Sequence, residues 1–454
     1  MARALRAREV SARELVTAHL EQIEEVDGRV NAVVTRVPER ALAEADAADA
    51  RLAAGDPVGP LHGLPIAHKD THLTAGIRTT FGSPLLVDFI PDADELVIER
   101  IRGAGAITIG KTNVPEFAAG SHTFNPVFGT TANPYDHSRS AGGSSGGAAA
   151  ALAAGMHPLA DGSDMGGSLR NPASFCNVVG LRPSPGRVPS YPSALPWATM
   201  GVQGPMARTV ADAALLLSVL AGPDPRSPVS LDVPGSTFAA PLDRDLTGLR
   251  VAWAPTLGGA VTVDPVVTAA LAPAAAVFAD LGAHIEPACP DLTGADEVFR
   301  TLRAWQFAAT MGPRRDRVKA ALAANIDDGR RLTGDDLARA ELARAALFHR
   351  VRAFFGRYDV LLAPVSQVPP FDAALEHPVE VDGVPHPHYL DWMASAYLIS
   401  AAGLPALSVP AGFTPDGLPV GLQVVGPPRG DLLALQVGHA FEQATQVGLR
   451  RPDL

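Results

Sequence analysis

The chain has 454 residues, of which 47% are hydrophobic and 19% are charged, a length that suits one large domain or two to three smaller ones. The formal net charge is −11, from 37 basic and 48 acidic residues. This charge argues against direct nucleic-acid binding, which needs clustered Lys and Arg. No apolar run reaches the length of a membrane span, and the N-terminal residues lack the apolar segment of a secretory signal.

The two cysteines, Cys176 and Cys289, are too few for a disulfide framework. We predict that both are buried free thiols, which favours a reducing, cytoplasmic location. Cys176 lies close to a glycine-rich turn, but no histidine motif marks it as a nucleophile.

Two helices are predicted near the N-terminus. Ser11 and Glu14 have the spacing of a capping box, and apolar residues follow at helical intervals, so residues 11–27 are predicted to form an amphipathic helix. A second helix, rich in Ala, Glu and Asp, is predicted over 39–52 and ends before a stretch of Pro and Gly. Because the first helix begins so close to Met1, we expect the natural chain to begin further upstream.

An apolar run over 63–70 is predicted to form a buried strand that carries Lys69. A predicted helix over 94–103 and a predicted strand over 104–110 follow it, and this alternation indicates an α/β fold. Residues 120–141 are rich in Gly, Ser, Asn and Pro. We predict that they form a loop and one wall of a pocket.

Two Gly-Gly-Ser units come next, Gly142-Gly143-Ser144 and Gly166-Gly167-Ser168, on either side of a predicted Ala-rich helix over 148–154. Glycine lets other atoms approach the backbone closely, and consecutive free N–H groups form a nest that binds negative charge. A serine in such a nest has an oxyanion hole beside it.

The second half of the chain is predicted to continue as a mixture of strands, helices and irregular segments. Strands are predicted over 178–183, 249–255, 358–364, 406–413 and 420–425, the last two joined as a hairpin. Helices are predicted over 209–221, 264–281 and most of 296–357. A surface connection is predicted over 222–247 and irregular structure over 366–390.

A serine needs a base to act as a nucleophile, and the usual base, histidine, is not evident here. Lys69 is the alternative, because burial in an apolar run disfavours the charged form of lysine and lowers its pKa. A decrease of about 3 units would cost roughly 4 kcal/mol and would give a usable base near neutral pH.

Five motifs together carry a family resemblance, which is dense over about 60–220 and returns near 395–445. They are Gly63-x-Pro65 with Lys69-Asp70, Gly110-Lys111-Thr112-Asn113 with Glu116-Phe117, Asn133-Pro134, Gly142-Gly143-Ser144-Ser145-Gly146-Gly147, and Asp164-x-Gly166-Gly167-Ser168-x-Arg170-x-Pro172. With them the sequence resembles the amidase signature family of serine hydrolases, whose members use a Ser-cisSer-Lys triad.

The resemblance implies that Lys69 is the general base, Ser168 the nucleophile and Ser144 a bridging serine held by a cis peptide bond. Neutral Lys69 would draw a proton from Ser144, which would draw one from Ser168 as it attacks a carbonyl. The expected reaction is hydrolysis of linear amide-type C–N bonds, not peptide bonds, through an acyl-enzyme. No metal or other cofactor is expected.

The resemblance also assigns the surroundings of the nucleophile. The oxyanion hole is expected to be formed by the backbone N–H groups of Met165, Gly166, Gly167 and Ser168. Asp164 and Arg170 are expected to form a buried pair that braces the turn, and Gly143 is a further supporting residue.

The fold expected from the resemblance is a single α/β domain over 1–454, with a mixed central sheet flanked by helices. Its parts are N-terminal helices over 1–60, a signature core over 61–222, and the second part of the sheet with the substrate-determining segments over 245–454.

Simpler interpretations of these residues stay open at this point. Ser168 suits the N-cap of a helix, and Lys69 could be an ordinary surface lysine. Ser144 also fits two other interpretations, the nucleophile elbow of α/β-hydrolases and a flexible Gly/Ser linker. The elbow requires a core strand before the serine, and the polar residues 136–140 are not typical of one. His68 and His72 are four apart, as metal-binding pairs can be, but no helical pattern and no intervening Glu support a metal site.

Met165 is the one departure from the family pattern, which commonly has Thr there. A thioether beside the nucleophile is expected to make the pocket more apolar. We therefore expect a stand-alone enzyme for apolar or aryl amides, with carbamates (urethanes) and esters as further substrates. The alternative is an amidotransferase component, similar to the amide-hydrolysing subunit of glutaminyl-tRNA amidotransferase, that acts only within a complex.

The expected partner is a small amide or carbamate substrate, and a homodimer is a further expectation, whereas nucleic acid and membrane are not expected partners. Aromatic residues of the second half are candidates for lining the substrate pocket, with the hydrophobic core as the alternative for each. These residues are Trp197, Trp305, Phe307 and Trp392.

Overall fold

A computed structural model describes residues 1–454 of the protein. Eight strands form a mixed sheet through its middle. Their order is β12–β11–β13–β17–β16–β9–β10–β8. β11 is parallel to β12 and β13, and all other neighbours are antiparallel. The strands are β8 (Leu159–Asp164), β9 (Val179–Arg182), β10 (Val202–Ala207), β11 (Arg250–Trp253), β12 (His284–Pro287), β13 (Val360–Pro364), β16 (Ala406–Phe413) and β17 (Pro419–Val425).

A second, three-stranded sheet lies beside the edge of the first. Its order is β1 (Val33–Arg36), β3 (Ile107–Thr112) and β2 (Pro65–Lys69). β2 packs against the edge strand β8, and the backbone N–H of Lys69 donates to Asp161 Oδ1 of β8 at 2.9 Å. The predicted mixed central sheet is confirmed. β2, the strand that carries Lys69, is hydrogen-bonded to β3 in the three-stranded sheet and not to the central sheet.

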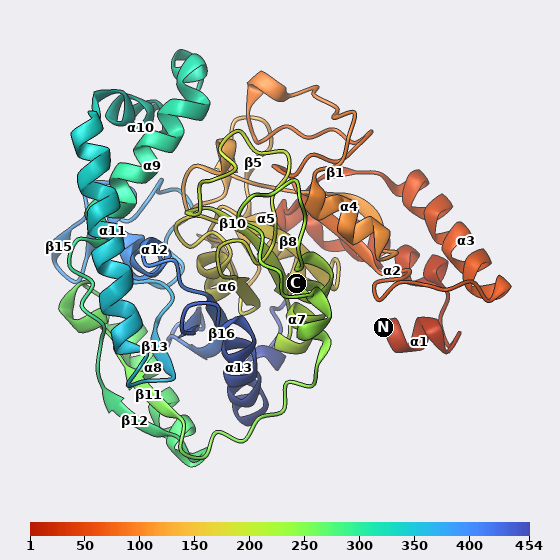
Figure 1. Ribbon diagram of the computed structural model, residues 1–454. Coiled ribbons are helices and arrows are strands. Elements are labelled where there is room, and N and C mark those ends of the chain that lie inside the picture. The colour runs from red at the N-terminus through yellow and green to blue at the C-terminus, as the bar shows by residue number, and fades with distance from the viewer.

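The N-terminal helices lie at one end of the molecule, on the right of Figure 1. They are α1 (Ala2–Arg6), α2 (Ala12–Val30), α3 (Pro38–Ala54) and α4 (Leu96–Gly103). The predicted capping box is present, because Ser11 and Glu14 hydrogen-bond to each other's backbone N–H groups at the start of α2. Both predicted N-terminal helices are therefore confirmed within a few residues.

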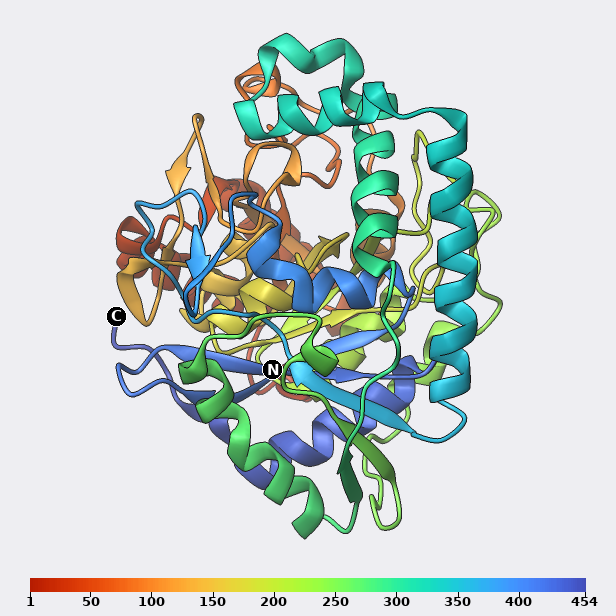
Figure 2. The same ribbon diagram turned by 90° about the vertical axis from the view of Figure 1, so that its left-hand side faces the viewer.

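Helices cover both faces of the main sheet. On one face α7 (Val210–Leu220), α8 (Pro265–Asp280) and α13 (Asp431–Thr445) pack against the strands, with α8 and α13 below the sheet in Figure 2. On the other face lie α5 (Gly146–Ala153), α6 (Arg170–Phe175) and α12 (Ala394–Ala401). Outside α12 a further layer is made by α9 (Ala295–Met311), α10 (Ala320–Arg331) and α11 (Gly334–Phe354).

Several elements were not predicted. The strands β8, β10 and β12 and the helices α12 and α13 are absent from the sequence-based expectations. The predicted loop 120–141 contains two short ladders, β4 (Phe124–Asn125) with β5 (Gly129–Thr130) and β6 (Ala132–Asn133) with β7 (Asp136–Ser140). A third short ladder pairs β14 (Glu380–Val381) with β15 (Val384–Pro385) inside the segment predicted to be irregular.

Both cysteines are free thiols, as predicted. Cys176 is buried, whereas Cys289 is only partly buried, which corrects the expectation that both are enclosed. No helix is long and apolar enough to cross a membrane.

Candidate active site

The amine of Lys69 lies among three serine hydroxyls in the protein interior. Its Nζ is 2.9 Å from Ser144 Oγ, 2.8 Å from Ser145 Oγ and 3.0 Å from Ser163 Oγ. Every residue of β2 is buried, so the strand brings this side chain in from the core rather than from solvent. Burial lowers the pKa of Lys69 to about 7, although the carboxylates of Asp164, Asp161 and Glu95 act in the opposite direction.

The three serines come from two different elements. Ser144 and Ser145 lie in the turn before α5, and the Gly143–Ser144 peptide bond is cis, as the resemblance implies. Ser163 lies on β8. Ser144 is preceded by β7, whose middle residues are exposed, so it does not follow the buried core strand that a nucleophile elbow requires.

Ser168 follows β8 and precedes α6, and it is 7% exposed. Its carbonyl accepts from the backbone N–H of Ser145 at 3.2 Å, which fixes the two Gly-Gly-Ser turns against each other. Ser168, Ser144 and Ser163 line one cavity. The hydroxyls of Ser144 and Ser168 are not directly hydrogen-bonded to each other.

The glycine turn before Ser168 leaves three backbone N–H groups without an acceptor in the chain, those of Met165, Gly166 and Ser168. The fourth, that of Gly167, donates to Asp164 Oδ1 at 2.9 Å. Of the four N–H groups expected to form an oxyanion hole, three are therefore free to bind a negative oxygen, and that of Gly167 is engaged by Asp164. Gly167 serves the shape of the turn instead, because its φ is +118° and a Cβ there would lie 2.7 Å from Ala396 Cβ.

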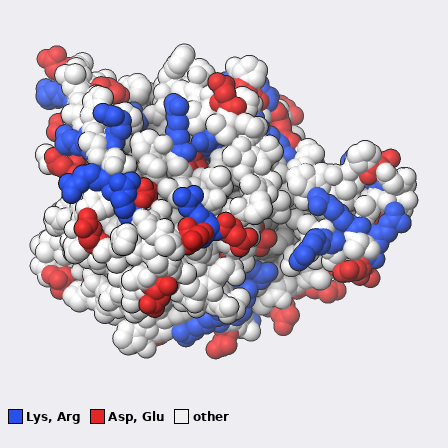
Figure 3. All heavy atoms as spheres, turned by 60° about the horizontal axis from the view of Figure 1, so that its bottom comes forward, with Lys and Arg blue, Asp and Glu red and all other residues white.

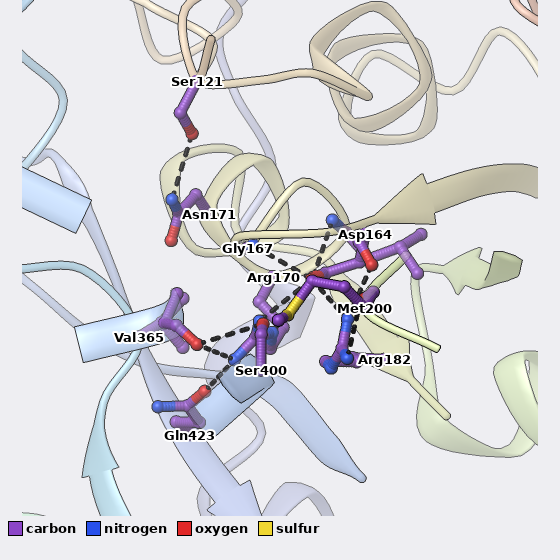
Figure 4. A network of polar contacts seen from close by, with 12 residues as sticks. Ser121, Asp164, Gly167, Arg170, Asn171, Arg182, Met200, Val365, Ser400 and Gln423 are labelled. Atoms are coloured by element: carbon purple, nitrogen blue, oxygen red, sulfur yellow. Dashed lines mark hydrogen bonds and ion pairs between the residues drawn. The ribbon is translucent and has the colours of Figure 1, made fainter. Parts of the chain in front are cut away.

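Asp164 holds this turn through two arginines, shown in Figure 4. Arg170 donates to both carboxylate oxygens, from Nη2 at 2.9 Å and from Nε at 3.0 Å. Arg182 of β9 lies 3.2 Å from the same carboxylate, and all three side chains are fully buried. Burial alone would raise the pKa of Asp164, but the two guanidinium groups outweigh it and hold that pKa well below its usual range. The predicted Asp164–Arg170 pair is present, and Arg182 was not foreseen.

Asp161, three residues earlier on β8, was also missed. Its carboxylate accepts from the backbone of Lys69 and contacts His68 Nδ1 at 2.5 Å and His72 Nδ1 at 2.7 Å. The two histidines considered as a metal pair are therefore both bonded to one carboxylate. This buried cluster fixes the end of β2 and thereby the origin of the Lys69 side chain.

The cavity above Ser168 has a volume of about 220 Å³ and adjoins a second one of about 250 Å³. The two share Met165, Ser190, Gly201, Val202 and Phe307. Apolar groups of the first cavity are Phe117, Ala118, Met165, Val202, Phe299, Phe307, Leu390 and Met393. Its charged and polar lining includes Arg303, Gln203 and Tyr389 beside the serines. The expected apolar surroundings of Met165 are present, with one arginine among them.

Of the four aromatic candidates for the pocket, only Phe307 lines it. Trp392 is 1% exposed and packs in the core against Phe175 and Phe371. Trp197 is 74% exposed on the surface. Trp305 lines neither cavity, because residues two apart on a helix do not face the same side.

Comparison with known proteins shows which family the chain belongs to. The sequence profile of the family described as Amidase matches residues 14–435. An acylamidase of Rhodococcus erythropolis is 37% identical, over 100% of this chain and 96% of the relative. A glutamyl-tRNA(Gln) amidotransferase subunit of Moorella thermoacetica is 38% identical, over 99% of this chain and 96% of the relative.

Solved structures give the same result. A bacterial aryl acylamidase of the amidase signature enzymes superposes with a TM-score of 0.92 and 31% identity, over 100% of this chain and 98% of that one. The corresponding glutamyl-tRNA(Gln) amidotransferase subunit from Thermotoga maritima superposes with a TM-score of 0.74 and 27% identity, over 98% and 95%. The chain belongs to the amidase signature family of amide-hydrolysing enzymes.

Proposed function

We propose that the protein hydrolyses amides through an acyl-enzyme on Ser168, with Ser144 and Lys69 as the path of the proton. The observation that carries this proposal is the buried amine of Lys69, whose pKa is about 7 and whose Nζ is 2.9 Å from Ser144 Oγ. A lysine with this pKa has a large neutral fraction just above pH 7, which is what a general base requires.

In the first half of the reaction Ser168 Oγ attacks the amide carbonyl. Its proton passes to Ser144 Oγ while the proton of Ser144 passes to Lys69 Nζ, so that the amine becomes an ammonium. Ser144 and Ser168 line the same cavity, and hydrogen bonds between such groups often shorten only when substrate is bound. The carbonyl oxygen, now negative, is stabilised by the N–H groups of Met165, Gly166 and Ser168.

In the second half of the reaction the proton returns. Lys69 gives it back through Ser144 to the nitrogen of the leaving group, the C–N bond breaks, and the amine departs from an ester on Ser168. Water then attacks this ester and gives its proton to the same relay. Collapse of the second intermediate returns that proton to Ser168 Oγ and releases the acid. No step in this sequence requires a metal or another cofactor.

The substrate that we propose is an apolar or aryl amide, with aryl carbamates and esters as further substrates. Met165, Phe299 and Met393 give the cavity an apolar wall beside Ser168. The relatives that are named acylamidase and aryl acylamidase support this class. Carbamates and esters present the same carbonyl carbon to Ser168, so the acyl chemistry is unchanged.

The second candidate is a subunit that works only inside an amidotransferase complex. Sequence identity does not separate the two, since 37% and 38% are equivalent. The TM-score is higher for the aryl acylamidase, 0.92, than for the amidotransferase subunit, 0.74, which favours the stand-alone enzyme.

Assay of the purified chain tests the proposal. Release of amine is measured from a primary amide, an aryl anilide and an aryl carbamate, with Ser168→Ala as the control. We expect turnover of the anilide without any added protein, and its loss in Ser168→Ala. Folded protein that turns over none of the three would favour the role in a complex, and full activity of Ser168→Ala would refute the nucleophile.

A further inference from the structure

Arg303 is a buried cation in the wall of the cavity that holds Ser168. It lies on α9, is 5% exposed and lines that cavity together with Ser144 and Ser168. Phe299, one helical turn earlier, contacts the glycine turn itself, because a Cβ on Gly166 would lie 2.8 Å from Phe299 Cζ. Residues four apart share a face of a helix, so Arg303 lies on the side of α9 that covers the candidate active site.

Few protein groups satisfy the guanidinium of Arg303. A guanidinium has five N–H donors, whereas Arg303 donates to Asn325 Oδ1 and has beside it only one further acceptor, the hydroxyl of Tyr389. Asn325 is itself held by Tyr389, whose hydroxyl accepts from Asn325 Nδ2 at 2.9 Å. The remaining contacts are with aromatic rings: the guanidinium carbon is 4.4 Å from the centroid of Phe307 and 5.4 Å from that of Tyr389.

No carboxylate neutralises Arg303, which forms no ion pair. Arg300, on the same helix, differs in this respect because it pairs with Asp296 at 2.8 Å and with Asp391 at 2.7 Å. Burial lowers the pKa of Arg303, and Tyr389 rather than any acid opposes this effect. Lys319, another cation nearby, has the carboxylates of Glu376 and Glu116 beside it.

A buried charge without a counter-charge is destabilising, so its presence in a cavity needs a reason. Each nitrogen atom of Arg303 either has a hydrogen-bond partner or is not fully enclosed by protein. Because Arg303 lines the cavity, its N–H groups without a partner face the cavity. Arginine presents paired donors that match a carboxylate in geometry as well as in charge. A carboxylate on a substrate in this cavity would satisfy these donors in both geometry and charge.

We infer that Arg303 is the specificity-determining residue for a carboxylate on the amide substrate, remote from the bond that is cleaved. This inference rests on the proposed function, because it assumes that the substrate occupies the cavity above Ser168. The substrate class becomes aryl or alkyl amides with one anionic end, such as the half-amide of a dicarboxylic acid or the acylated form of an aromatic amino acid. The apolar wall contacts the body of the substrate, and Arg303 binds its charged end.

Binding measured by calorimetry tests this inference without relying on turnover. The protein is Ser168→Ala, so ligands are not consumed. The acyl-side ligands are N-phenylsuccinamate, N-phenylglutaramate and N-phenyladipamate, and the amine-side ligand is para-acetamidobenzoate. Each is compared with an analogue in which an isopropyl group replaces the carboxylate. Comparison of the acyl-side ligands with the amine-side ligand shows on which side of the amide the carboxylate is bound.

We expect at least one carboxylate ligand to bind about tenfold or more tightly than its isopropyl analogue, the difference typical of a charge-assisted hydrogen bond. Adding Arg303→Met should abolish this preference while leaving the isopropyl analogue within about threefold of its affinity, which also shows that the cavity is folded. Arg303→Lys should restore part of the preference, because it restores the charge without the paired donors.

Lys319→Met is the matched control, since it removes a neighbouring positive charge that does not line this cavity. It should leave the preference within about threefold. A preference that survives Arg303→Met, or the absence of any preference in both arms, would overturn the inference. Turnover of a neutral anilide by the protein with Ser168 intact is measured in parallel, and its failure would count against the proposed function instead.

Discussion

At the scale of single residues, the amine of Lys69 meets three hydroxyls, which sets a limit on its hydrogen bonds. A neutral lysine amine has two N–H donors and one lone pair, whereas its ammonium has three donors. With Ser144, Ser145 and Ser163 all within 3.0 Å of Nζ, the neutral form requires one of the three hydroxyls to donate to the nitrogen. A serine that donates to this nitrogen is already in the geometry that proton transfer to Lys69 needs.

The pH dependence of activity follows from the same residue. The pKa of Lys69 is lowered to about 7, so the neutral base is lost as pH falls through that value and is fully present well above it. For a neutral anilide we expect kcat/KM to fall to about one tenth of its plateau at pH 6 and to be nearly level above pH 8. A profile that is flat from pH 5 to 9, or that rises up to pH 10 as for an ordinary lysine, would contradict the role of Lys69.

Stability depends on Asp164 because two buried arginines face it. Asp164→Asn should destabilise the protein by about 3–5 kcal/mol, since it leaves Arg170 and Arg182 without their counter-charge. Urea unfolding followed by circular dichroism measures this. The control Asp136→Asn removes a half-exposed carboxylate that lies 3.6 Å from Arg139, and it should change stability by less than about 0.5 kcal/mol. Equal effects of the two substitutions would refute the bracing role.

The candidate residues that the sequence identified lie within motifs, whereas the missed ones act across long sequence separations. Ser144, Asp164, Arg170 and Ser168 stand in glycine-rich motifs, and Lys69 ends an apolar run that follows a Gly-x-Pro unit. Asp161 and Arg303 stand in no such motif. What marks Arg303 is burial without a counter-charge, which no local pattern encodes because the absence of a partner is a property of the folded chain.

At the scale of elements, the site depends on the junction between β2 and β8. β8 was missed because its sequence, Leu-Ala-Asp-Gly-Ser-Asp, lacks β-branched and aromatic residues. Its two carboxylates are buried nevertheless, because Asp161 and Asp164 each find two or more partners inside the protein. Strands such as β2 and β17, which are largely apolar, were found from their composition.

Two glycines test how tightly the elements approach one another. A Cβ on Gly180 of β9 would lie 2.3 Å from the carbonyl oxygen of Leu169, just before α6, so Gly180→Ala should destabilise the protein by about 2 kcal/mol or more. Gly28 lies inside α2, and a Cβ there would have nothing within 4 Å, so Gly28→Ala should stabilise the protein by about 0.5–1 kcal/mol. Chemical unfolding compares the two, and effects of the same sign would contradict the packing described here.

At the scale of the whole molecule, the central sheet and the helix α9 line opposite sides of the cavity above Ser168 with different chemical groups. The sheet and the glycine turns supply the serines and the free N–H groups, and α9 covers them and supplies Phe299, Arg303 and Phe307. That the second half of the chain decides the substrate stays a prediction, because Phe117, Met165 and Val202 of the first half line the same cavity. On the face drawn in Figure 3, basic and acidic side chains are intermixed rather than gathered by sign.

The most direct test of the central claim is to locate the acyl group. The purified protein is mixed with an activated aryl ester, whose good leaving group makes the attack of Ser168 faster than the later attack of water, and is then quenched with acid, digested and analysed by mass spectrometry. We predict that the acyl group lies on Ser168 and is absent from Ser168→Ala treated in the same way. An acyl group on Ser144 or Cys176 in the native protein, or equal labelling of Ser168→Ala, would contradict the account.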